Sequence, residues 1–112
     1  TPLRNGRAGP DTEWIVIARD EYRNSRPWWS ADSNLLYFIS NRDGFWCIWA
    51  QRLDPARKTP AGAPFEVQPF HSARGSSSSR AATWFGPAPA RDFLVYSIGD
   101  NTANVWVGEP RK

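Results

Sequence analysis

The side chains that could carry acid–base or nucleophilic chemistry are few, and the only histidine, His71, is the first of them. His71 is followed by Ser72, and with one of the aspartates the two could form a Ser-His-Asp triad. A nucleophilic serine is normally held on a rigid elbow such as Gly-x-Ser-x-Gly, and the sequence contains no such motif. We therefore expect a chain that is not an enzyme and has no catalytic residues.

The sequence also gives little support for a metal or cofactor site. One histidine and one cysteine, Cys47, do not supply a converging set of ligands, and Cys47 lies inside an apolar run that favours a buried thiol. Asp32 and Asp43 lie in turn-forming sequences, where an aspartate accepts backbone N–H groups without any calcium ion. We expect neither a metal site nor a cofactor.

The elements that would position any site are short strands separated by Gly, Pro, Asp and Ser. No segment keeps the 3.6-residue apolar period of a helix. The strongest local signal is the 41–44 turn, with its Asp-Gly pair, leading into the apolar run 45–53. The predicted strands cover residues 14–18, 26–29, 35–40, 45–53, 65–70, 83–85, 93–98 and 103–107.

Part of this pattern occurs twice. Asp43, Ile48 and Trp49 recur at a fixed offset of 57 residues. Their counterparts are Asp100, Val105 and Trp106. Two copies of a unit made of short strands indicate a repeat architecture, whose units cannot each bury their own faces.

The first copy resembles the repeat of TolB-like (WD-repeat-like) β-propellers. That repeat reads Pro-x-Trp-Ser-x-Asp-Gly, then a hydrophobic strand ending in Ser, then Arg-Asp-Gly and Ile-Trp. The matching residues here are Pro27, Trp29, Ser30, Asp32, the run 35–40, Arg42, Asp43, Gly44, Ile48 and Trp49. Ser33 stands where the repeat has Gly and Ala31 where Pro is common, and both changes weaken the turn.

The resemblance implies an all-β fold of two four-stranded antiparallel propeller blades, which complete a six-bladed β-propeller by oligomerisation. The expected parts are a flexible lead at 1–13, an orphan strand at 14–19 that closes a neighbouring blade, a first blade at 26–70, a Ser-rich loop at 71–80, a three-stranded second blade at 81–108 and a tail at 109–112.

Two blades alone would leave sheet edges unpaired, so the chain is expected to associate. The orphan strand can add to the 103–107 edge of a neighbouring copy as a strand-swapped latch, and three copies would supply six blades. The latch residues are Trp14, Ile15, Val16 and Ile17. The alternative partner is the rest of a longer propeller, because a sequence without Met is expected to be processed or to come from a larger protein.

Most tryptophans are expected in the core, because neighbouring blades cover both faces of a blade. The candidate binding residues are Arg42, Arg74 and Trp46, and the two arginines lie beside turns at blade ends. The formal charge is +3, and the charged residues are scattered along the chain, which argues against a nucleic-acid partner. No run of residues is apolar enough to span a membrane.

We therefore predict a non-enzymatic propeller module for protein interaction or self-assembly. Two alternatives remain open: an accessory or gating propeller domain of a larger enzyme, such as a hydrolase or kinase, and a glycan-binding propeller. The family resemblance alone suggests a bacterial periplasmic or extracytoplasmic location.

Overall fold

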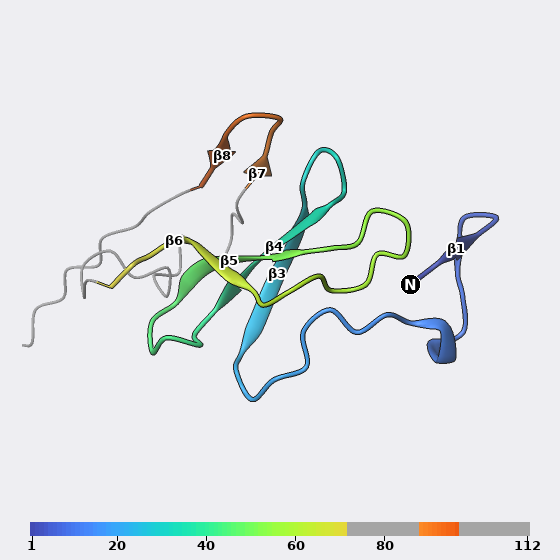
Figure 1. Ribbon diagram of the computed structural model, residues 1–112, viewed down its shortest axis with the longest axis horizontal. Coiled ribbons are helices and arrows are strands. Elements are labelled where there is room, and N and C mark those ends of the chain that lie inside the picture. The colour runs from blue at the N-terminus through green and yellow to red at the C-terminus, as the bar shows by residue number, and fades with distance from the viewer. Residues whose placement is uncertain (72–87, 97–112) are drawn as a thin grey trace, which may run out of the picture.

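The computed structural model describes residues 1–71 and 88–96 as an all-β chain of antiparallel sheets (Figure 1). The largest sheet has four strands in the order β3-β4-β5-β6. These strands are β3 (Asn24–Trp29), β4 (Leu35–Ser40), β5 (Cys47–Arg52) and β6 (Phe65–Gln68). Two small hairpins pair β1 (Leu3–Arg4) with β2 (Arg7–Ala8) and β7 (Ala88–Pro89) with β8 (Leu94–Val95).

The all-β class and a four-stranded antiparallel sheet within the predicted first blade are thus confirmed. The arrangement of blades in a propeller stays a prediction. A 3-10 turn, η1 (Asp11–Glu13), precedes the segment that leads to β3. Across the two described ranges, no helix has the length and apolar character needed to cross a membrane.

The β3–β4 connection is a turn stabilised by the side chain of Ser30. The Ser30 hydroxyl accepts the backbone N–H of Leu35 at 2.9 Å, and the Ser33 N–H donates to the Ser30 carbonyl at 2.9 Å. Ser33 has a φ of +58°, a conformation that glycine adopts with less strain. This is the position where the resembled repeat carries Gly.

The β4–β5 pair is the regular centre of the sheet. Its register runs without a break from Leu35↔Arg52 to Ser40↔Cys47. The predicted 41–44 turn is confirmed, because the N–H of Gly44 donates to the Asn41 carbonyl at 3.0 Å. Gly44 has a φ of +90°, which an L side chain rarely adopts, so this position requires glycine.

Strand β6 is shorter and irregular. Ile48 pairs with Gln68 and Trp49 with Glu66, so Val67 is an extra residue in the ladder, as in a β-bulge. Pro69 follows the strand and has no N–H to continue the pairing. The chain then leaves the ladder and bends across the end of β5.

The core lies on both faces of β4 and β5. Residues directly opposite in an antiparallel pair share a face, so Phe38 and Trp49 lie on one face, the Trp49 face, and Ile39 and Ile48 lie on the other, the Ile48 face. The buried hydrophobic residues are Leu36, Phe38, Ile39, Cys47, Ile48, Ala50, Leu53 and Phe70.

The N-terminal part contains a hairpin that the sequence analysis did not predict. Within the predicted flexible lead, Asn5 (φ +53°) and Gly6 (φ +74°) form the two-residue turn between β1 and β2. Residues 14–19 pair with none of the strands in the described residues, and their addition to a neighbouring copy stays a prediction.

The predicted second blade is described only at residues 88–96. Residues 88–89, expected in a loop, pair as β7 with β8, which is shorter than the predicted strand 93–98. The predicted strands 83–85 and 103–107, the loop 72–80 and the tail lie outside the described residues. The same holds for Arg74, Asp100 and Trp106.

Candidate functional site

Arg42, a predicted surface-binding residue, is packed into the protein. Its side chain is only 11 % exposed, and its guanidinium forms an ion pair with Asp20 at 2.9 Å. The same group lies over two rings of the Trp49 face, 5.2 Å from the ring centre of Phe38 and 5.0 Å from that of Trp49. Arg42 therefore contributes to packing and is poorly placed to bind a ligand.

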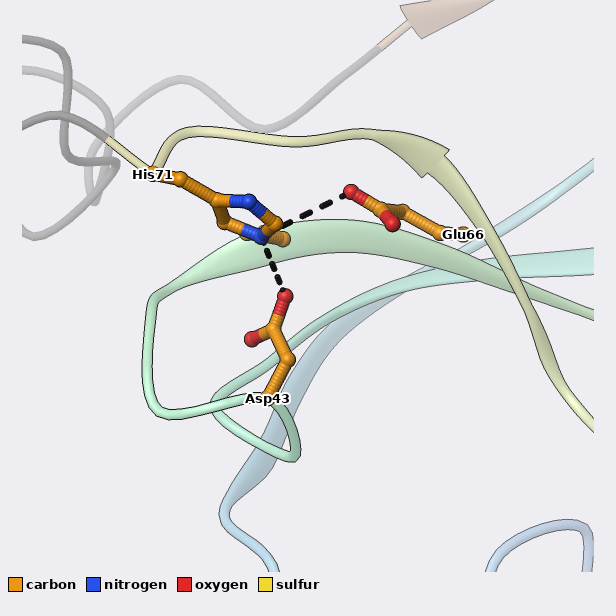
Figure 2. A group of neighbouring side chains, drawn as sticks. Asp43, Glu66 and His71 are labelled. Carbon is orange, nitrogen blue, oxygen red and sulfur yellow. Dashed lines mark hydrogen bonds and ion pairs between the residues drawn. The ribbon is translucent and has the colours of Figure 1, made fainter.

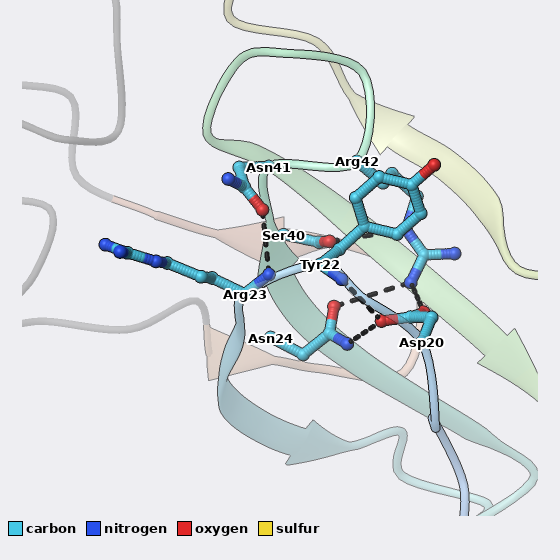
Figure 3. Close-up of polar contacts among 7 residues, drawn as sticks. All are labelled: Asp20, Tyr22, Arg23, Asn24, Ser40, Asn41 and Arg42. Carbon is cyan, nitrogen blue, oxygen red and sulfur yellow. Dashed lines mark hydrogen bonds and ion pairs between the residues drawn. The ribbon is translucent and has the colours of Figure 1, made fainter.

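Asp20 joins this arginine to the segment that enters β3 (Figure 3). Its Oδ1 atom accepts the Asn24 side-chain amide at 2.7 Å and the backbone N–H of Tyr22 at 3.2 Å. The Arg23 N–H donates to the Asn41 side chain at 2.8 Å. These contacts attach residues 20–24 to the β4–β5 turn.

The predicted latch lies in an extended segment whose exposure alternates. Trp14 and Val16 are 57 % and 48 % exposed, whereas Ile15 and Ile17 are half-buried. Ile17 lines a small apolar hollow with Leu36 and Phe38. The segment thus turns one apolar side toward the Trp49 face and the other outward.

The repeat residues hold different positions in the sheet. Trp49 is half-buried, with an indole N–H that has no hydrogen-bond partner among the described residues, whereas Trp29 is 49 % exposed and is an exception to the expectation that most tryptophans lie in the core. Trp46, a candidate binding residue, is half-buried. Asp32 accepts hydrogen bonds from the Ser30 hydroxyl at 2.6 Å and from the Asn34 N–H at 3.1 Å, which confirms its role in a turn.

Asp32 precedes β4, and His71 lies near the other end of that strand, where β5 begins (Figure 2). Its Nε2 atom is 2.7 Å from Oδ2 of Asp43 and 3.7 Å from Oε1 of Glu66. Cys47 completes this group, because one ligand atom from each of the four residues lies within 4.8 Å of all the others. We call these residues the His71 cluster.

Local structure positions each member of the His71 cluster. Asp43 is in the tight β4–β5 turn, Cys47 begins β5, and Glu66 lies in β6 opposite Trp49. His71 follows the bend at Pro69. Cys47 is fully buried, whereas the other three reach the surface, so the cluster is open to solvent on one side.

The electrostatics of the cluster follow from this mixed burial. Burial alone would raise the pKa of Asp43, but hydrogen bonds from His71, the Phe45 N–H and Cys47 outweigh it and lower that pKa. Burial, aided by the nearby carboxylates of Asp43 and Glu66, raises the pKa of Cys47 to about 11. At neutral pH the thiol is therefore protonated.

Sequence reasoning missed this convergence because it treated His71 and Cys47 as isolated. Glu66 was not considered, and Asp43 was interpreted as a turn residue only. A signal was present in the spacing: Asp43 and Cys47 flank the start of one strand, and Glu66 and His71 flank the end of the next. Antiparallel pairing brings such ends together. The structure also pairs His71 with an aspartate, but Ser72 lies outside the described residues.

The chain matches no known family model, curated protein or solved structure. The TolB-like resemblance and the functions that it implies therefore remain proposals.

Proposed function

We propose that this chain is a non-enzymatic sheet module that functions by association, as a blade-like part of a β-propeller completed by further copies of itself. The observation that carries the proposal is the burial pattern of β4 and β5. On β5 the four residues Cys47, Ile48, Trp49 and Ala50 are all buried or half-buried, although they alternate between the two faces. Near-continuous burial is typical of strands covered on both sides, as in stacked sheets.

Each face of the sheet has a partial cover within the chain. On the Ile48 face, Tyr37 lines a hollow together with Ala90 and Arg91, which connect β7 to β8. Leu94 and Tyr96 pack against the core cluster that contains Ile48, and the rings of Phe70 and Tyr96 meet edge to face at 5.7 Å between centres. On the Trp49 face, the cover comes from Ile17 and from the residues around Arg42. Within residues 1–71 and 88–96 both covers are thin, since β7 and β8 are two residues long and 14–19 pairs with no described strand.

The outward surface supports association with a second copy. Large hydrophobic side chains are exposed at both covers and at the edge strand β3: Trp14, Val16, Tyr22, Trp29, Phe93 and Val95. Trp14 and Val16 belong to a segment that pairs with none of the strands in the described residues. Strand addition at a sheet edge uses such a segment, with main-chain hydrogen bonds for affinity and alternate side chains for specificity.

The solution mass of the full chain tests the proposal. We expect light scattering and native mass spectrometry to find a stable multiple of 12.7 kDa, with a trimer favoured. Val16→Lys places a charge on the outward side of the segment and should shift the distribution toward monomer. Leu3→Lys, at a similarly exposed position on the β1–β2 hairpin, is the matched control.

A folded monomer at high concentration would overturn self-association. If the wild type were monomeric but bound a separately supplied propeller portion, association with a longer chain would replace the homo-oligomer. Equal effects of Val16→Lys and Leu3→Lys would exclude 14–17 as the contact.

A further inference from the structure

The His71 cluster combines nitrogen, sulfur and oxygen donors at one point of the sheet. The thiol of Cys47, the imidazole of His71 and the carboxylates of Asp43 and Glu66 present atoms that all lie within 4.8 Å of one another. Mixed imidazole, thiolate and carboxylate sets suit zinc, whereas calcium and magnesium prefer oxygen ligands alone. The geometry points to a Zn²⁺ site formed by Asp43, Cys47, Glu66 and His71.

The distances fit a four-coordinate ion with small side-chain adjustments. Zinc lies about 2.0–2.3 Å from N, O and S ligands, so tetrahedral ligand atoms are about 3.3–3.8 Å apart. Nε2 of His71 is 3.7 Å from Glu66 Oε1, already in that range. Its 2.7 Å contact with Asp43 Oδ2 is a hydrogen bond that an ion between the two atoms would replace.

Backbone groups outside the ligand set orient the donors. The Phe45 N–H donates to Oδ1 of Asp43 at 3.1 Å and leaves Oδ2 directed at His71. The Phe70 N–H donates to the Cys47 sulfur at 3.2 Å, a contact that stabilises a thiolate better than a neutral thiol. The ring of Phe45 lies 5.1 Å from that of His71 and shields one side of the imidazole. Outer contacts of this kind are typical of metal sites.

The site would fasten the chain after Pro69 to the β4–β5 turn. All four ligands come from the protein, as in structural zinc sites, and binding releases the thiol proton of Cys47 to solvent. An ion bound only by the folded chain stabilises it by mass action. This inference does not depend on association, because the four ligands belong to one chain.

The test uses the full chain, freed of metal with a chelator, and Zn²⁺ alone. We expect equilibrium dialysis with metal analysis to find one Zn²⁺ per chain, and the thermal midpoint to rise with Zn²⁺ concentration. Co²⁺ as a spectroscopic substitute should give a thiolate-to-cobalt charge-transfer band, which only Cys47 can supply, as the chain has no other cysteine.

Variants at half-exposed ligands separate metal binding from folding. Loss of an outer partner of a ligand already weakens metal binding by about 10–100-fold, so we expect roughly 100-fold weaker binding in Glu66→Gln and His71→Ala. The matched control for Asp43→Asn is Asp32→Asn, which alters a turn carboxylate at the other end of β4. The Asp32→Asn variant should bind Zn²⁺ like the wild type.

Three results would overturn the assignment. They are no Zn²⁺ uptake by the wild type at millimolar concentration, unchanged affinity in Glu66→Gln and His71→Ala, and Co²⁺ binding without a charge-transfer band. Circular dichroism of each metal-free variant verifies that it is folded.

Discussion

The guanidinium carbon of Arg42 lies 5.0 Å from the centre of the Trp49 ring, on the face of the sheet that the N-terminal segment covers. The same guanidinium is paired with Asp20 at 2.9 Å. One side chain therefore links the β4–β5 turn, the central strand and the segment that enters β3. This relationship gives Arg42 a role in stability, where the sequence had suggested a role in binding.

Arg42→Ala should reduce the free energy of unfolding by about 2 kcal/mol, because it removes a largely buried ion pair and the stacking over Trp49. Urea denaturation measures this loss. Arg57→Ala is the control, since Arg57 is exposed and, among the described residues, only its backbone N–H is hydrogen-bonded. If both variants were equally stable, the packing role of Arg42 would be refuted.

Ser33→Gly should stabilise the protein. Ser33 has a φ of +58°, and within the part of the chain that the structure describes only its backbone groups make hydrogen bonds, so the turn keeps these contacts in the variant. Glycine relieves the strain of the left-handed conformation, but it also makes the unfolded chain more flexible. The net effect is an expected gain of about 0.5–1 kcal/mol in the free energy of unfolding. Ser25→Gly, inside β3, should instead cost about 0.5–1 kcal/mol in the same urea experiment. A loss of stability in Ser33→Gly would contradict the turn geometry.

Asp32 should contribute to the pH dependence of stability. Hydrogen bonds from the Ser30 hydroxyl, and then from Asn34, lower its pKa. Its contribution is therefore fully present above the pKa of an unfolded aspartate and is lost as pH falls through the lower folded value. We expect Asp32→Asn to be less stable than the wild type at pH 6 and the difference to shrink at pH 2–3, as followed by thermal denaturation. A difference that grew on acidification would contradict this sign.

Cys47 should resist alkylation in the metal-free folded protein. The thiol is fully buried, and burial together with nearby carboxylates raises its pKa to about 11, so little thiolate is present at pH 8. Iodoacetamide labelling, followed by mass spectrometry, should be slow without urea and rapid in 6–8 M urea. Rapid labelling of the folded chain would mean that this end of β5 opens readily.

The central hairpin could be predicted from sequence because its signals are local. β4 has the predicted bounds, and the 41–44 turn forms where the Asp-Gly pair indicated. The Asn5-Gly6 hairpin had an equally clear signal, the strongest known for a two-residue turn, and was overlooked.

The His71 cluster could not be predicted in the same way, because it depends on register. Glu66 is opposite Trp49, on the face that carries Cys47, and the bulge at Val67 shifts the register of the residues that follow, but no propensity of Val67 indicates a bulge. The burial of Arg42 likewise depends on Asp20, 22 residues earlier in the chain, whose position beside the turn is a tertiary effect.

The bulge at Val67 fixes the spacing between Glu66 and His71. The loop before β6 should therefore tolerate insertions and deletions that the segment after Glu66 should not. Deleting one residue between Glu66 and His71 would move the imidazole by about one strand step, 3.3 Å, away from Asp43 and turn its neighbours to the opposite face. Adding a residue at the exposed tip of the preceding loop, near Ala56, would leave the spacing from Glu66 to His71 intact. Relatives of this chain that keep the four ligands should therefore vary in length before Phe65 and keep a constant count of residues after it.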